Sequence, residues 1–257
     1  MTRWTAIFIL LAALLARANG AADNLGQAGV REFTAAYQAW DGKHFAIAAD
    51  RFRQATTNAP GNSTNFYWLG VAEFHRRLQL QNQAGAATNK PAAAMALDAA
   101  LAALGTAVKL NPSDAESHAL LATLYGMKID GNLIRGARFG PRIAAHRQPA
   151  LEFGAKNPRV RYLLGTCQFH TAKKAAAHRE ALATFLKAQE LFEAEAKTPA
   201  GPLDPRWGYD TCLTFIGRTY EQLGDRTKAA DYFRKALALH PADHLAKDGL
   251  ARVTEGK

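Results

Sequence analysis

The fold of this chain is decided by residues 213–241, LTFIGRTYEQLGDRTKAADYFRKALALHP. The first half spaces large and small apolar side chains along one helix face, at about 3.6 residues per turn: Leu213, Ile216, Gly217 and Tyr220. The second half does the same for another helix: Ala229, Phe233 and Ala236. Gly224 marks the turn between them, and Pro241 ends the unit. The stretch therefore predicts a hairpin of two packed helices.

Gly217 stands in the middle of the first predicted helix, where glycine costs about 1 kcal/mol relative to alanine. That cost is explained if the second helix crosses close to the backbone at this point, with Ala229 facing the glycine and Phe233 beside it. One such hairpin cannot bury its apolar face alone, so stacked neighbours are needed. We therefore expect further copies along the chain.

The order of large, small, aromatic and proline positions closely resembles the tetratricopeptide repeat (TPR), a helix-turn-helix unit of about 34 residues. Similar units recur at roughly residues 29–61, 62–112, 113–158, 159–205 and 210–243, followed by a capping helix at 244–253. The resemblance implies an all-α superhelical solenoid of about five repeats with a concave surface, where family members bind peptides or proteins. The carboxylate-clamp residues of some chaperone-binding members are missing, so no particular ligand is implied.

Three stretches depart from the repeat pattern. Residues 80–90 are rich in Gln, Asn, Gly and Ala and predict an inserted loop, with Pro91 as the first residue of the next helix. In the third unit, the glycines of residues 130–140 disfavour a helix, so we expect the second helix only at about 142–156. Residues 198–207 contain three prolines and predict a loop.

Residues 1–20 have the features of a secretory signal peptide, and residues 21–257 are the predicted solenoid domain. Arg3 supplies a positive end, an apolar core follows at residues 6–16, and small residues offer cleavage sites near Ala18. The core is short for a bilayer, and no run elsewhere approaches the roughly 20 apolar residues of a membrane span. We expect a periplasmic or secreted protein; an uncleaved membrane anchor is the alternative. Residues 19–28 are expected to form a polar lead-in.

The formal net charge of +10 is concentrated in one part of the chain. Residues 21–127 contain eight basic and eight acidic side chains, and residues 175–257 contain twelve of each. Residues 128–174 contain ten basic and only two acidic side chains. This stretch coincides with the irregular third repeat. A local excess of this kind attracts an anionic partner.

We expect this basic surface to bind an acidic protein or peptide, because arginine suits bidentate contacts to carboxylates. Its predicted partner-binding residues are Lys128, Arg135, Arg138, Arg142, Arg147, Arg159 and Arg161. The alternative is a solvated charged face whose arginines pair with acids of neighbouring repeats. A membrane surface is a weaker alternative, and nucleic acid is disfavoured because few aromatic side chains accompany the charges.

No pattern in the sequence predicts a catalytic, metal or cofactor site. Cys167, His170 and His178 lie near one another on predicted helices but match no known ligand spacing. Cys167 and Cys212 are expected in the first helices of adjacent repeats, at positions about two helical turns apart along the helix axis. This separation exceeds the reach of a disulfide. The sequence therefore predicts a non-enzymatic binding scaffold; the alternatives are a cell-envelope hydrolase or its activator, and a self-associating structural module.

Overall fold

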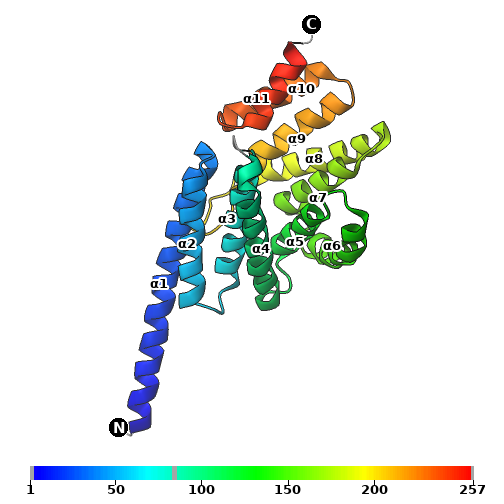
Figure 1. Cartoon of the computed structure of the whole chain (residues 1–257). Helices are drawn as coiled ribbons and strands as arrows, with labels where there is room; N and C mark the ends of the chain where they lie inside the picture. The colour runs from blue at the N-terminus through cyan, green and yellow to red at the C-terminus, as the bar shows by residue number, and fades with distance from the viewer. Residues whose placement is uncertain (1–2, 83–85, 256–257) are drawn as a thin grey trace. The chain divides into compact units, whose positions relative to one another are not determined.

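The chain folds into helices joined by short turns, as a computed structural model describes for residues 3–82 and 86–255 (Figure 1). This described part contains eleven helices and no strand. It divides into two compact units, Met1–Tyr37 with Asp41–Pro112, and Gln38–Trp40 with Ser113–Lys257. The all-α prediction is confirmed.

The first unit contains four helices: α1 (Arg3–Ala39), α2 (Gly42–Asn58), α3 (Ser63–Asn82) and α4 (Ala86–Leu110). Aromatic side chains form its centre, where the rings of Phe52 and Trp68 stack at 5.8 Å with an interplanar angle of 8°. Phe33 contacts Trp68 edge to face at 5.3 Å. The first and second helix pairs of the chain thus share one apolar core.

One segment in the described part, Thr88–Leu110 of α4, is long and apolar enough to cross a membrane by length and composition alone. This differs from the expectation that no such run exists, because alanines raise the mean hydropathy to 1.5 without forming a continuous run of large apolar residues. Its inner face packs against α3, with Ala100 and Leu104 fully buried. Packing within the first unit accounts for the apolar residues on that face.

The second unit contains seven helices: α5 (Ala115–Ile129), α6 (Leu133–Phe153), α7 (Pro158–Thr171), α8 (Ala175–Glu195), α9 (Tyr209–Gln222), α10 (Arg226–Leu239) and α11 (His244–Thr254). They pair in chain order as α5 with α6, α7 with α8, and α9 with α10, while α11 packs on α9 and α10. The first helices of successive pairs also touch, α5 with α7 and α7 with α9. This is the arrangement expected of stacked repeats and a terminal capping helix.

The close helix crossing inferred at Gly217 is present. A Cβ atom added there would lie 2.8 Å from Phe233 and 3.2 Å from the carbonyl oxygen of Ala229. The preceding pair repeats the contact, since a Cβ added at Gly165 would lie 2.6 Å from the ring of Phe185. Glycine is required at both positions because a larger residue would push the paired helices apart.

Several expected loops are helical. Helix α6 begins at Leu133 and continues through Pro141, so the prediction of a non-helical segment up to residue 140 was wrong. The Asn132 side chain accepts a hydrogen bond from the backbone N–H of Arg135 and caps the helix, and the contacts that α6 makes with α5 offset the weak helix propensity of its glycines.

The expected start of the helix at Pro91 was also wrong, because α4 already begins at Ala86. Proline removes one hydrogen bond near the start of the helix, and the long apolar face that follows outweighs this loss. Residues 83–85 of the predicted insertion lie outside the described residues. The predicted lead-in at 19–28 is helical and continuous with the rest of α1. The loop at 198–207 and the last helix agree with the prediction.

Replacing Gly217 by alanine should lower the free energy of unfolding by about 1–3 kcal/mol, because the added methyl group meets Phe233 and backbone atoms at once. Guanidinium unfolding measures the change. Gly126→Ala in α5 is the matched control, because nothing lies within 4 Å of its added Cβ, and it should stabilise by about 0.5–1 kcal/mol. Equal effects of the two changes would show that the close crossing does not matter.

Candidate functional site: a basic helix and a buried arginine

Helix α6 presents most of the predicted basic surface. Arg135, Arg138 and Arg142 are exposed and follow one another at spacings of three and four residues, which places them along one stripe of the helix. Arg147 is also exposed but lies about a third of a turn away from that stripe. Only Ala150 of α6 is fully buried. The helix is therefore held along a narrow side and leaves the stripe open to solvent.

Aromatic rings position two arginines of the stripe. The Arg142 guanidinium lies 5.5 Å from the ring centroid of Tyr125 on α5 and 6.0 Å from that of Phe139. Arg138 lies 5.4 Å from the Phe139 centroid, and the Tyr125 and Phe139 rings stack at 5.8 Å. These cation–π contacts limit side-chain motion without neutralising the positive charge. The arginines are thus partly ordered before any partner arrives.

Two aliphatic side chains beside the stripe escaped the sequence analysis. Leu133 is 91% exposed and Ile134 is 82% exposed, at the turn of the chain into α6. Ile134 is four residues before Arg138, so it lies next to the stripe on the helix surface. The sequence does indicate their exposure, because both follow the capping Asn132 directly and neither continues the apolar face of the helix. The surface therefore combines positive charge with exposed apolar area.

A pair of histidines lies further along the same helix pair. The Nδ1 atoms of His118 on α5 and His146 on α6 are 2.9 Å apart, so one ring nitrogen donates a hydrogen bond and the other accepts it. Burial and the neighbouring His118 lower the pKa of His146 to about 4. The imidazole of His146 is therefore neutral at pH 7 and adds no charge to the basic surface.

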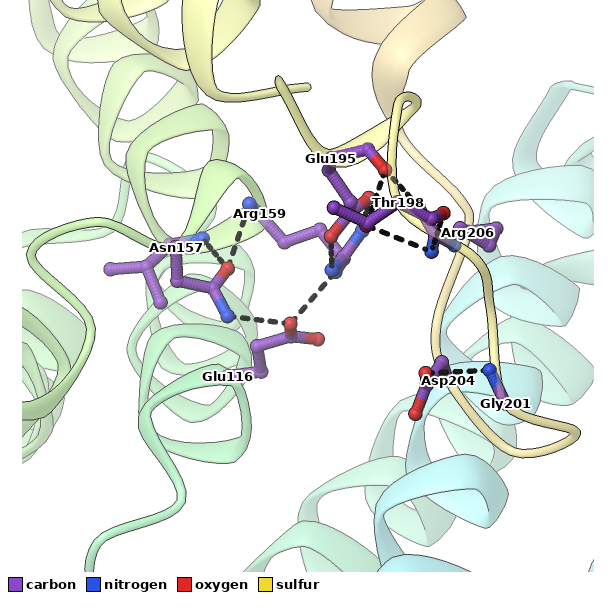
Figure 2. A network of polar contacts seen from close by, with 9 residues as sticks. Glu116, Asn157, Arg159, Glu195, Thr198, Gly201, Asp204 and Arg206 are labelled. Carbon is purple, nitrogen blue, oxygen red and sulfur yellow. Dashed lines mark hydrogen bonds and ion pairs between the residues drawn. The ribbon is translucent and has the colours of Figure 1, made fainter. Parts of the chain in front are cut away.

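Arg159 of α7 does not belong to that surface, because its side chain is only 3% exposed. Figure 2 shows the acidic and amide side chains around it. Its Nε donates to Glu116 on α5 at 2.7 Å, and its Nη1 and Nη2 both donate to the carboxylate of Glu195 on α8, the former at 2.9 Å. The side chain of Asn157 joins the network by donating to Glu116 at 2.7 Å. A guanidinium used in this way is not available to a partner. For Arg159, the structure therefore agrees with the alternative given in the sequence analysis, in which arginines of this stretch pair with acids of neighbouring repeats.

The same network holds the loop between α8 and α9 (Figure 2). Arg206 donates to the carbonyl oxygens of Glu195 and Thr198 at 2.6 and 3.0 Å, and Gly201 donates its N–H to Asp204 at 2.8 Å. A shallow hollow beside the network is lined by Phe153, Pro158 and Leu191 among others. Because the loop's polar groups bond one another and the end of α8, the loop is an ordered part of the repeat stack.

The two remaining predicted residues, Lys128 and Arg161, lie on other helices than the stripe. Lys128 is half-buried in the last turn of α5. Arg161 is half-buried on α7 and donates to the carbonyl oxygen of Ala155 at 3.0 Å. The structure thus brings Arg135, Arg138 and Arg142 together, with Lys128 in the helix that precedes them, and ties Arg161 to the turn before its own helix.

The cysteine and histidine candidates form no metal site. No group of three or more potential ligands comes together within the described residues. Both cysteines are free, and burial raises the pKa of the Cys167 thiol. At neutral pH Cys167 is therefore a protonated thiol within the helix stack.

Comparisons with known proteins identify the fold. The profile of the family described as Regulator of microtubule dynamics protein 1-3 matches residues 53–252. No curated protein matches the chain by sequence. The crystal structure of TTC0263, a thermophilic TPR protein of Thermus thermophilus, superposes with a TM-score of 0.63 at 16% identity and covers 91% of this chain and 98% of its own. The Cut9–Hcn1 structure from the APC/C gives 0.56 at 17% identity, covering 94% and 39%. The TPR resemblance is confirmed at the level of fold.

Replacing Arg159 by alanine should lower the free energy of unfolding by about 3–5 kcal/mol, because Glu116 is left as a buried charge without its cation. Guanidinium unfolding of the full chain tests this. Arg135→Ala, which removes an exposed arginine from the same basic region, should change stability by no more than about 0.5 kcal/mol. A loss below about 1 kcal/mol for Arg159→Ala would contradict a stabilising role for the network.

Proposed function

The chain belongs to the Regulator of microtubule dynamics protein 1-3 family and has the TPR fold, and from this we propose that it is a protein-binding scaffold whose α6 stripe binds an acidic segment of its partner. The observation that carries the proposal is the stripe of Arg135, Arg138 and Arg142, which is exposed to solvent and has two of its arginines, Arg138 and Arg142, against aromatic rings. We define these three residues as the α6 stripe.

The charge distribution supports an acidic partner. Two acidic side chains of the third and fourth repeats, Glu116 and Glu195, pair with Arg159 and not with the stripe. The stripe therefore retains its positive potential, which steers anionic partners toward it. Arginine donors that are already ordered lose less rotamer entropy when a carboxylate binds than free side chains would.

The exposed aliphatic residues refine the kind of segment that fits. Ile134 lies beside Arg138, and Leu133 precedes it, so a bound segment would meet an apolar contact next to the positive charges. A protein interface combines such an apolar contact with surrounding polar pairs. We therefore expect the partner segment to contain an apolar side chain between or beside its acidic residues.

The amino-terminal features support export, as a separate part of the proposal. A positive start, an apolar core at residues 6–16 and small residues near Ala18 are the features that signal peptidases recognise. Intact-mass measurement of the exported protein should show loss of about the first 20 residues. Recovery of the protein with Met1 retained would contradict cleavage and favour a membrane anchor.

The binding role is tested by affinity capture from periplasmic extract with the full chain and two charge variants. The first variant changes the α6 stripe to glutamate at all three positions. The second makes the same change in net charge at exposed cations outside the stripe: Arg179→Glu, Lys235→Glu and Lys247→Glu. We expect one partner to be recovered by the native chain and the second variant, and to be lost by at least tenfold with the first.

Recovery of the same partner by both variants would contradict binding through the α6 stripe. Equal loss with both variants would show that only net charge matters, which also counts against a specific site. Capture of the chain itself as the main species would instead favour a self-associating module. Circular dichroism of each variant checks that its fold is kept.

A further inference from the structure

Arg218 on α9 is a half-buried cation with an unusual environment. Its guanidinium carbon lies 4.9 Å from the ring centroid of Phe169 on α7 and 4.9 Å from that of Phe215 on α9. The two rings contact each other edge to face at 5.4 Å. In the part of the chain that the structure describes, Arg218 makes no ion pair with a carboxylate and donates no hydrogen bond to a protein acceptor. The guanidinium therefore packs against two aromatic rings and makes no direct ion pair.

The nearby acidic groups are already engaged. Glu221 receives two hydrogen bonds from Arg252, from Nε at 2.8 Å and from Nη2 at 3.0 Å. Asp243 accepts from the Thr214 hydroxyl at 2.6 Å and from the backbone N–H groups at the start of α11. Both carboxylates attract Arg218 at longer range, but neither makes an ion pair with it. This contrasts with Arg159, a buried arginine of the same unit, which has two carboxylates.

Holding a cation in this way is unfavourable for the unbound protein. Burial, together with the positive charge of Arg252, lowers the pKa of Arg218. Polar groups removed from water cost free energy unless they find partners. Aromatic faces return part of that cost, but they do not satisfy guanidinium donors as a carboxylate does. Because Arg218 is half-exposed, an anion from solution can reach it.

We propose that Arg218, held between Phe169 and Phe215, is an anchoring site for one carboxylate of the bound partner. This inference rests on the proposed function, because it assigns a second contact to the same acidic partner. The site takes a carboxylate from either of two sources, an Asp or Glu side chain or the carboxyl terminus of the segment. Bidentate hydrogen bonds from the planar guanidinium suit both.

The test is a nuclear magnetic resonance titration of the full chain, following the Nε–H signals of arginine side chains. The Arg218 signal is assigned by its loss in Arg218→Lys, which keeps the positive charge. Three probes are added: hexaglutamate, hexaglutamate with an amidated carboxyl terminus, and hexaglutamine. We expect the Arg218 signal to shift with hexaglutamate and to stay unchanged with hexaglutamine.

The amidated probe separates the two carboxylate sources, since a side-chain carboxylate still shifts the signal and a terminal one no longer does. A shift of the α6 stripe signals without any shift of Arg218 would overturn this inference and leave the proposed function standing. A shift of Arg218 without the stripe would overturn the proposed stripe and support the anchoring site. No shift of either would overturn both.

Discussion

The contact between a glycine in the first helix of a repeat and an aromatic ring in the second is the constraint from which the arrangement of the last repeats follows. Phe185 and Phe233 press against the backbone at Gly165 and Gly217 and set how closely each pair packs. Pairs at this separation expose apolar faces that only the next pair can cover, so the repeats must stack. The third repeat has Ala122 in place of the glycine, and its second helix, α6, contributes only one fully buried residue.

Because α6 is held along a narrow side, it can present a row of arginines without exposing the core. Arg159 joins α5, α7 and α8 through Glu116 and Glu195, so these two acids pair with a buried arginine. Burial, rather than sequence position, thus separates the structural arginine from the arginines that we propose for binding. Arg159 pairs with two acids, whereas Arg138 and Arg142 of the α6 stripe contact aromatic rings and solvent.

The helix pairs near the carboxyl terminus could be predicted from sequence because spacing, turn residues and the final proline agree with one another. The first part of α6, residues 133–141, was missed because glycine and proline disfavour a helix locally, whereas the Asn132 cap and packing on α5 are decided by tertiary structure. Among the predicted site residues, charge counting located the stretch in which basic side chains concentrate. It could not tell buried Arg159 from exposed Arg138, since burial depends on which acids the fold brings near. Arg218 was missed because its two aromatic neighbours come from different helices.

The central claim is that α6 is the part of the scaffold that meets the partner. Hydrogen–deuterium exchange of the full chain, alone and with the captured partner, tests this most directly. The account predicts slower exchange across residues 133–147 on binding, while the buried helix contacts around Arg159 exchange slowly in both states. Unchanged exchange across residues 133–147, with the partner bound, would contradict it.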